Sequence, residues 1–315
     1  MKIKEFKNLD EQIELLKSRG LTFKDEEKAK EILFRENYFF ISGYRHLLTK
    51  KDNNHKFIYG ATFEELYAIF TFDRRFRNII FKNVLIVENN IKSIISYQLS
   101  KKYGVKDKEY LRPSSFTQDR IKVRQVNDLI SKMKRQVRIN GSQHSATLHY
   151  LNNYGYVPLW ILVKVLSFGI LSEMYAILKH DDQEVIASHY NISVEELEKY
   201  LSMLANYRNL CAHEDIMFEN KTQKIIDDTK YHKLLNIDIV DGDFMYGKND
   251  VFALIIILKY MLSDDEFRLL VQEIDYELNI LDGKVDIISQ ENILDRMGFP
   301  VNYRDIINKE VCYEN

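Results

Sequence analysis

Residues 62–99 read TFEELYAIFTFDRRFRNIIFKNVLIVENNIKSIISYQL. Apolar side chains recur in this stretch at steps of three and four, the spacing that gathers them on one face of an α-helix. Thr62 and Glu65 form a capping box, the side-chain pairing with which many helices begin. The stretch therefore predicts one long helix, interrupted at most once.

Shorter helical patterns lie on both sides of this stretch. Pro158 introduces an apolar run over residues 159–178, and proline suits the first turn of a helix. Ser193 and Glu196 form a second capping box, before a helix that continues toward Asn209. Further helices are expected over residues 10–18, 26–34, 119–138, 252–262 and 265–278.

Turn-forming residues are scarce, with 11 Gly and 3 Pro among 315 residues, which favours long helices. Asp241-Gly242 lies between β-branched residues and predicts a small β-hairpin near residues 236–247. The predicted fold class is all-α, predominantly helical. We divide the chain into an N-terminal helical region (1–60), a core (61–220) and a C-terminal helical extension (221–315) whose role stays open.

The overall composition indicates a folded protein of a reducing compartment. Forty-five Lys and Arg balance 47 Asp and Glu, and the chain has two cysteines, Cys211 and Cys312, without a CxxC pair. The start of the chain lacks the hydrophobic core of a signal peptide, and the longest apolar run is too short to cross a bilayer. We therefore expect a soluble cytoplasmic protein with no membrane partner.

Positive charge is concentrated in residues 101–138, where twelve basic and four acidic residues give a net charge of +8. The whole chain has a net charge of −2, so the remainder carries −10. Tyr103, Tyr110 and Phe116 are interleaved with the cations, a composition that suits single-stranded nucleic acid through phosphate attraction and base stacking. A solvated helix face is the alternative interpretation. The cations predicted to bind RNA are Lys101, Lys102, Arg112, Arg120, Lys122, Arg124, Lys132, Lys134, Arg135 and Arg138.

Most catalytic signatures are missing, including GxGxxG, GxxxxGK[ST], HExxH and GxSxG, and we predict no metal and no cofactor. What remains is an Arg-x4-His element, Arg208 and His213, near the end of an amphipathic helix. A guanidinium that grips a phosphate and an imidazole that moves protons near neutral pH suffice for metal-free RNA cleavage. Asn209 shares a helical face with His213 and could orient its ring. The alternative is a helix C-terminus at which Arg and His merely neutralise the dipole.

The spacing within this element sets a geometric condition. Residues five apart on a helix point in directions that differ by roughly 140°. Arg208 and His213 therefore converge on one phosphodiester only if the helix ends there or a second copy of the chain supplies the missing group. A second set of charges, Asp73, Arg77 and Glu88, lines one stripe of the long helix among apolar positions. Charges facing an interior must be paired or functional, and we infer a supporting role beside Arg208 and His213. The alternative is a structural ion pair between Asp73 and Arg77, four residues apart, with Glu88 exposed to solvent.

Several motifs occur in the order seen in the Abi-like bacterial abortive-infection proteins, of the AbiD and AbiF type, which belong to the wider HEPN superfamily. The similarity spans roughly residues 10–220. The motifs that carry it are Asn37-Tyr38-Phe39-Phe40-Ile41-Ser42-Gly43-Tyr44, Phe63, Phe72-Asp73-Arg74 with Arg77, Glu88, Pro158-Leu159-Trp160, Ser167-Phe168-Gly169 and Tyr207-Arg208-Asn209 with Ala212-His213.

The resemblance implies a HEPN-like helical bundle and a metal-independent endoribonuclease that acts as a toxin in phage defence. It implies Arg208 and His213 as the catalytic pair, with Asn209 as the polar residue after the arginine. HEPN motifs commonly meet in pairs, so a chain with one motif is expected to form a homodimer with a composite site. A small non-coding RNA is a further expected partner. The alternatives are a non-catalytic RNA-binding module and a protein-binding antitoxin or scaffold.

Overall fold

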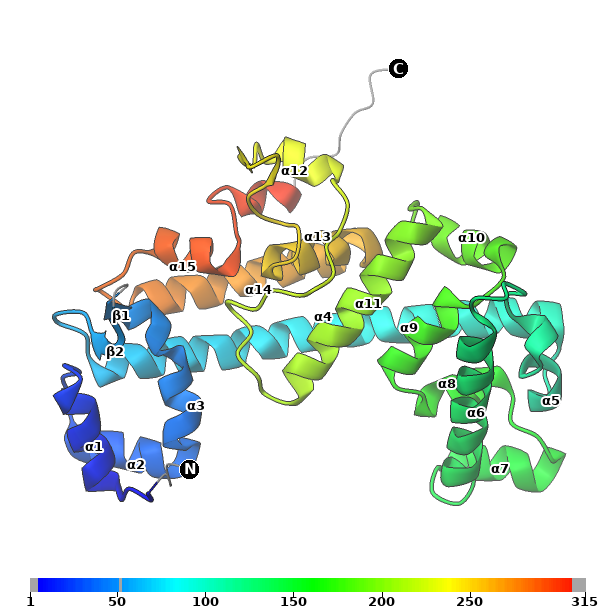
Figure 1. Cartoon of the computed structure of the whole chain (residues 1–315), viewed down its shortest axis with the longest axis horizontal. Helices are drawn as coiled ribbons and strands as arrows, with labels where there is room; N and C mark the ends of the chain where they lie inside the picture. The colour runs from blue at the N-terminus through cyan, green and yellow to red at the C-terminus, as the bar shows by residue number, and fades with distance from the viewer. Residues whose placement is uncertain (1–4, 51–52, 308–315) are drawn as a thin grey trace.

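The computed structural model describes residues 5–50 and 53–307, and α4 (Phe63–Tyr103) is its central element. The Thr62 hydroxyl accepts a hydrogen bond from the Glu65 N–H, and the Glu65 carboxylate accepts one from the Thr62 N–H, so the predicted capping box is present. The helix continues for 41 residues without a break. It runs along the long axis of the molecule, and the other helices pack around it (Figure 1).

The N-terminal elements surround the first half of α4. They are α1 (Leu9–Ser18), α2 (Glu26–Glu36), α3 (Tyr38–Ser42) and the 3₁₀ helix η1 (Gly43–Leu48), followed by the antiparallel strands β1 (Thr49–Lys50) and β2 (Asn53–Phe57). The predicted helices over residues 10–18 and 26–34 are confirmed as α1 and α2. The β1–β2 pair was not predicted, because its residues show no period-two apolar pattern.

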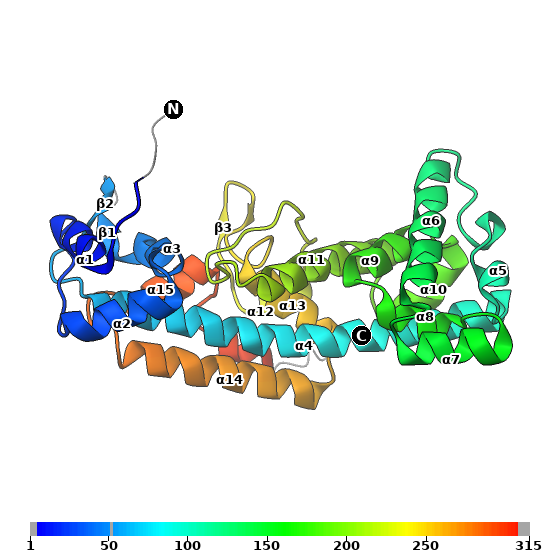
Figure 2. The same ribbon diagram turned by 90° about the horizontal axis from the view of Figure 1, so that it is seen from below.

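The segment from residue 107 to 188 packs at the other end of α4 (Figures 1 and 2). Its elements are α5 (Asp107–Tyr110), η2 (Pro113–Ser115), α6 (Val123–Asn140), α7 (Ser145–Tyr154), α8 (Leu159–Val165), α9 (Phe168–Ala176) and α10 (His180–Ser188). The apolar run over residues 159–178 forms two helices and not one. Leu166 is extended, with ψ 136°, and the Ser167 hydroxyl caps α9 by accepting the Ile170 N–H.

The C-terminal part completes the hydrophobic core. After α11 (Val194–Ala212) come α12 (Lys230–Leu234), α13 (Val251–Met261), α14 (Asp264–Asp282), α15 (Gln290–Met297) and η3 (Tyr303–Ile307). Helix α13 is almost wholly buried, and α14 runs beside α4 in the opposite direction (Figure 2). The predicted hairpin is confirmed as β3 (Ile239–Val240) and β4 (Asp243–Phe244), joined through Asp241 and Gly242, both at positive φ.

The described residues contain fifteen α-helices and two pairs of short strands, which confirms the predominantly all-α fold. None of these helices is both long enough and apolar enough to span a lipid bilayer. Cys211 is buried and carries a free thiol, whereas Cys312 lies outside the described residues.

Candidate functional site

Helix α11 ends at the predicted catalytic histidine. His213 is the C-cap, and Glu214 follows in the left-handed region at φ 57°. The Asp215 N–H donates to the Leu210 carbonyl and the Glu214 N–H to the Cys211 carbonyl, the pattern of a Schellman motif. His213 itself keeps a nearly helical backbone, with φ −95° and ψ 2°. The end of the helix therefore does not turn the imidazole toward Arg208, and the angular separation expected from the sequence persists.

Arg208 lies over α4, and its side chain is 31% exposed. Its Nε atom is 3.5 Å from Glu88 Oε2, and its guanidinium lies 5.7 Å from the centre of the Phe81 ring. Neither Arg208 Nε nor Glu88 Oε2 has a hydrogen-bond partner, so the pair is an ionic contact without hydrogen-bond geometry. The contact restrains one edge of the guanidinium. No described group accepts a hydrogen bond from its terminal nitrogens.

Glu88 is buried, with 4% of its surface exposed. The alternative in which Glu88 is exposed to solvent is therefore wrong. Lys92 Nζ donates to Glu88 Oε1 over 2.6 Å, one helical turn further along α4. The carboxylate thus lies between the ammonium of Lys92 and the guanidinium of Arg208. Sequence reasoning missed Lys92, although its position four residues after Glu88 in an apolar stretch is a detectable signal.

Asp73 binds the loop that follows His213. Its carboxylate accepts hydrogen bonds from the Met217 N–H (3.1 Å) and the Phe218 N–H (2.8 Å). It also accepts one from the Tyr44 hydroxyl over 2.6 Å and forms an ion pair with Arg77. Burial raises the pKa of the Asp73 carboxyl, and its four donors oppose that shift.

Arg77 strengthens this attachment from its position one turn after Asp73. Its guanidinium donates to the Tyr44 hydroxyl over 2.9 Å and to the Asp215 carbonyl over 3.3 Å. We call Tyr44, Asp73 and Arg77 the loop clamp, because together they hold the loop over residues 215–218 against α4. The clamp residues are buried. Tyr44 belongs to a motif that the sequence analysis singled out, but no role was assigned to it.

The stripe of α4 therefore lies beside the Arg-x4-His element, at two places. Its N-terminal charges, Asp73 and Arg77, contact the loop after His213, and Glu88 contacts Arg208. The Asn209 and His213 side chains are exposed, and no hydrogen bond among the described residues joins them. The backbone joins the two residues instead, because the His213 N–H donates to the Asn209 carbonyl over 3.0 Å. An orienting role for the Asn209 amide thus has no contact within one chain to support it.

The ten cations of the segment 101–138 that were predicted to bind RNA fall into two groups. Four make internal contacts: Lys102 with Asp181 and Asp182, Lys122 with the Ala176 carbonyl, Lys132 with Glu173, and Arg124 with Asp128 at 3.9 Å. Six are exposed and have no ion pair within the described chain. These are Lys101, Arg112, Arg120, Lys134, Arg135 and Arg138.

The aromatic residues of this segment do not form the predicted base-stacking surface. Tyr110 and Phe116 are 2% and 1% exposed, and the Tyr110 hydroxyl donates to the Val157 carbonyl. Tyr103 is partly buried, and its hydroxyl donates to Asp182 over 2.5 Å. The expectation was wrong because aromatic residues alternating with cations also arise where an amphipathic segment packs one face into the core.

The predicted RNA-binding segment and the predicted catalytic element lie apart along the molecule. Figure 1 shows α6, which carries Lys134, Arg135 and Arg138, toward the far end of α4, whereas the C-terminal end of α11 lies near its middle. Within residues 5–50 and 53–307, no cluster of three or more His, Cys, Asp or Glu side chains could hold a metal ion.

Comparison with known proteins gives one match. Residues 31–219 match the family of Abi-like proteins, and this segment includes the loop clamp, Glu88, Arg208 and His213. No curated protein and no solved structure matches the chain. The matched segment covers more than half of the 315 residues, so the chain belongs to the Abi-like protein family.

Proposed function

We propose that this protein is a metal-independent endoribonuclease of the HEPN type that acts as a toxin in phage defence. Membership of the Abi-like family points to abortive infection as its setting. The observation that supports the chemistry is the surroundings of the Arg-x4-His element. A buried carboxylate, Glu88, restrains Arg208, and a buried clamp fixes the loop directly after His213.

The proposed reaction uses the nucleophile that RNA already carries. His213 removes the proton of a 2′-hydroxyl, and the 2′-oxygen attacks the adjacent phosphorus. The bond between phosphorus and the 5′-oxygen breaks, and that oxygen takes a proton from water while the protonated His213 returns its proton to the solvent. The products are a 2′,3′-cyclic phosphate and a 5′-hydroxyl. Arg208 stabilises the negative charge that develops on the non-bridging oxygens. This proposed reaction needs no oxidant, reductant or metal.

A composite site accounts for the separation of the two side chains. Arg208 and His213 leave α11 in different directions, so two chains in a symmetric dimer would pair the guanidinium of one with the imidazole of the other. The exposed cations of the segment 101–138 would then contact RNA, either the substrate or a small non-coding RNA that restrains the toxin.

The test uses growth inhibition and RNA cleavage by the full-length protein. Arg208→Ala and His213→Ala are each expected to abolish both, while the circular dichroism spectrum and thermal midpoint stay unchanged, because both side chains reach solvent. Arg268→Ala on α14 and His189→Ala after α10 are matched controls on exposed residues and should remain toxic. Full toxicity of either α11 variant would contradict the catalytic assignment.

A non-catalytic RNA-binding module is the second candidate, and the six exposed cations without ion pairs favour it. It predicts RNA affinity that falls steeply with salt, and no cleavage by the wild-type protein under any condition. Sequencing the RNA that co-purifies with wild type and with His213→Ala separates the candidates. Intact RNA with both proteins supports the module, whereas RNA that is intact only with His213→Ala supports the nuclease.

A further inference from the structure

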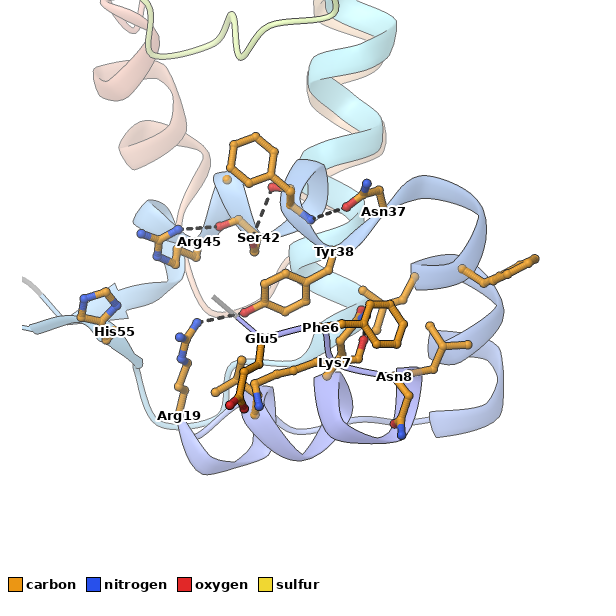
Figure 3. Close-up of a pocket in the computed structure, with 17 residues that line it drawn as sticks. Glu5, Phe6, Lys7, Asn8, Arg19, Asn37, Tyr38, Ser42, Arg45 and His55 are labelled. Carbon is orange, nitrogen blue, oxygen red and sulfur yellow. Dashed lines mark hydrogen bonds between the residues drawn. The ribbon is translucent and has the colours of Figure 1, made fainter. Parts of the chain in front are cut away.

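A large pocket lies at the N-terminal end of the molecule, between α1, α2, α3 and β2 (Figure 3). Its volume is about 1070 Å³, at the upper end of the range of ligand sites. Neither Arg208 nor His213 lines it. The pocket is therefore a feature that the proposed catalytic chemistry does not use.

Aromatic rings and cations share this pocket. Figure 3 shows Phe6 beside Tyr38 in its middle and Arg19, Arg45 and His55 at one end. Among the described residues the Phe6 ring is 90% exposed, so it is accessible to a ligand in the pocket. Arg19 donates to the Tyr38 hydroxyl over 3.0 Å, which fixes a guanidinium beside the ring.

The polar groups of the wall suit the edges of nucleobases. Gln12 Oε1 is buried without a hydrogen-bond partner, while Gln12 Nε2 donates to the Lys7 carbonyl. The Asn37 side-chain oxygen accepts from the Phe39 N–H, which leaves its amide NH₂ as a donor. Amide side chains offer donors and acceptors that match base edges, and Gln12 offers an acceptor that still lacks its donor.

The wall of the pocket also touches the candidate catalytic segment. Gly43 lines the pocket, and a Cβ atom at this glycine would lie 2.9 Å from Cδ1 of Ile216. Ile216 follows His213 by three residues, in the loop that the clamp holds. The next residue after Gly43 is Tyr44, which binds Asp73. The pocket wall therefore packs against the loop of His213 at Gly43, although no residue of that loop lines the pocket.

We infer that this pocket seats unpaired nucleotides of a single-stranded RNA, with bases stacked on Phe6 and Tyr38 and phosphates facing Arg19 and Arg45. The inference rests on the proposed function, which supplies the RNA. It transfers the stacking role from Tyr110 and Phe116, which are buried, to the exposed ring of Phe6 and the partly exposed ring of Tyr38. Lys7 and Arg19 outnumber Glu5 along the wall, in keeping with an anionic ligand.

The test measures RNA binding by the full chain carrying His213→Ala, so that the probe stays intact. The probe is a short single-stranded RNA of mixed sequence with one 2-aminopurine, whose fluorescence falls when the base stacks on an aromatic ring. Phe6→Ser should weaken binding by about 5- to 150-fold, the range for loss of one stacking ring, and should reduce the quenching to what stacking on Tyr38 alone gives. Arg19→Gln should weaken binding and flatten its salt dependence.

Tyr59→Ser is the matched control, because Tyr59 is fully exposed and lies outside the pocket. It should bind and quench like the parent. Parent-like binding by Phe6→Ser and Arg19→Gln would overturn the inference, as would equally tight binding of an abasic RNA or of a free mononucleotide. If the pocket variants lose RNA while the wild-type protein cleaves none, the inference stands and the proposed nuclease function fails. If cleavage depends on Arg208 but the pocket variants bind RNA normally, the proposed nuclease function stands and the inference about the pocket fails.

Discussion

At the scale of single residues, Glu88 is the side chain whose placement carries the most consequence. A carboxylate inside an apolar helix stripe is costly unless its charge is compensated, and Lys92 and Arg208 supply that compensation from two sides. Lys92 compensates within α4 itself. The contact with Arg208 therefore adds little that α4 needs for folding, and its effect is to restrain the guanidinium relative to α4.

The first prediction concerns Glu88→Gln. Loss of the negative charge frees Arg208 and leaves Lys92 without its counter-ion, so kcat for RNA cleavage should fall on the order of ten- to hundredfold with little change in KM. Single-turnover kinetics on a short RNA, beside urea unfolding, provide the measurement. Glu273→Gln removes an exposed carboxylate paired with Lys82 and serves as the control. If Glu88→Gln cleaved at the wild-type rate, the restraint on Arg208 would have no catalytic role.

At the scale of the element, the start of α13 contains a titrating group. Asp250 caps this helix by accepting the Ala253 N–H, and it also accepts the Gly247 N–H. Gly298, at φ +75°, packs against the Asp250 side chain. A Cβ atom at this glycine would lie 2.3 Å from the Asp250 carboxyl carbon. Burial raises the pKa of Asp250 to about 6, against the hydrogen bonds that lower it.

A pH dependence follows from this raised pKa. An unfolded aspartate has a pKa of about 3.9, so between pH about 4 and 6 the folded state binds the proton more tightly. The free energy of unfolding should therefore fall as pH rises through this window, by about 3 kcal/mol from this group. Asp250→Asn should remove that slope while the control Asp241→Asn, on an exposed turn, keeps it. Urea unfolding across the window measures both; equal slopes in wild type and Asp250→Asn would refute the prediction.

The segment 101–138 offers a test with two exposed cations, one with ion-pair partners and one without. Arg135 on α6 is exposed without an ion pair, whereas Lys102 is bound to Asp181 and Asp182. Arg135→Gln should weaken RNA binding and reduce the slope of log affinity against log salt by about 1 at most. Lys102→Gln should leave that slope nearly unchanged, because its charge is already neutralised. Equal effects of the two changes, measured by fluorescence anisotropy, would contradict RNA contact by α6.

Features of the fold that depend on one short segment could be predicted from the sequence, whereas features that depend on packing could not. The long helix α4 and the hairpin at Asp241-Gly242 follow from spacing within one segment, and both were predicted, although one break in the helix was left open. The split between α8 and α9 was not, because Leu166 and Ser167 interrupt the helix without interrupting the apolar run. The spacing of apolar residues indicates which residues face the core, but it does not reveal a single extended residue between two helices.

The candidate site also has parts that could be predicted from one segment and parts that could not. Arg208 and His213 were found as a motif within one helix, and the stripe of charges was found within another. The contact between Glu88 and Arg208 depends on how α11 crosses α4, and the bond from Tyr44 to Asp73 joins residues 29 positions apart. Such contacts arise from packing angles that no short pattern contains. The aromatic residues at positions 110 and 116 were misassigned for a related reason, since burial is decided by the tertiary fold.

At the scale of the whole molecule, α4 connects the two surfaces that the proposals assign to RNA. The pocket of α1–α3 lies at its first half and α6 at its far end, with the Arg-x4-His element between them (Figures 1 and 2). Within one chain, His213 is solvent-exposed and Arg208 is held on α4 by Glu88. Under the proposed function this arrangement is a half-site, which a second chain would complete.

The last prediction tests this half-site directly with mixed dimers. Arg208→Ala and His213→Ala proteins are each expected to be inactive, because every site in either homodimer lacks one group. A dimer with one chain of each kind contains one site that has lost both groups and one that keeps the guanidinium of one chain and the imidazole of the other. Co-expression under two affinity tags and sequential purification isolates these dimers, and part of the wild-type cleavage rate should return. A symmetric two-fold interface requires that outcome if the groups act across it. Inactive mixed dimers, or a chain that light scattering shows to be monomeric while it cleaves RNA, would place both groups of one active site in a single chain.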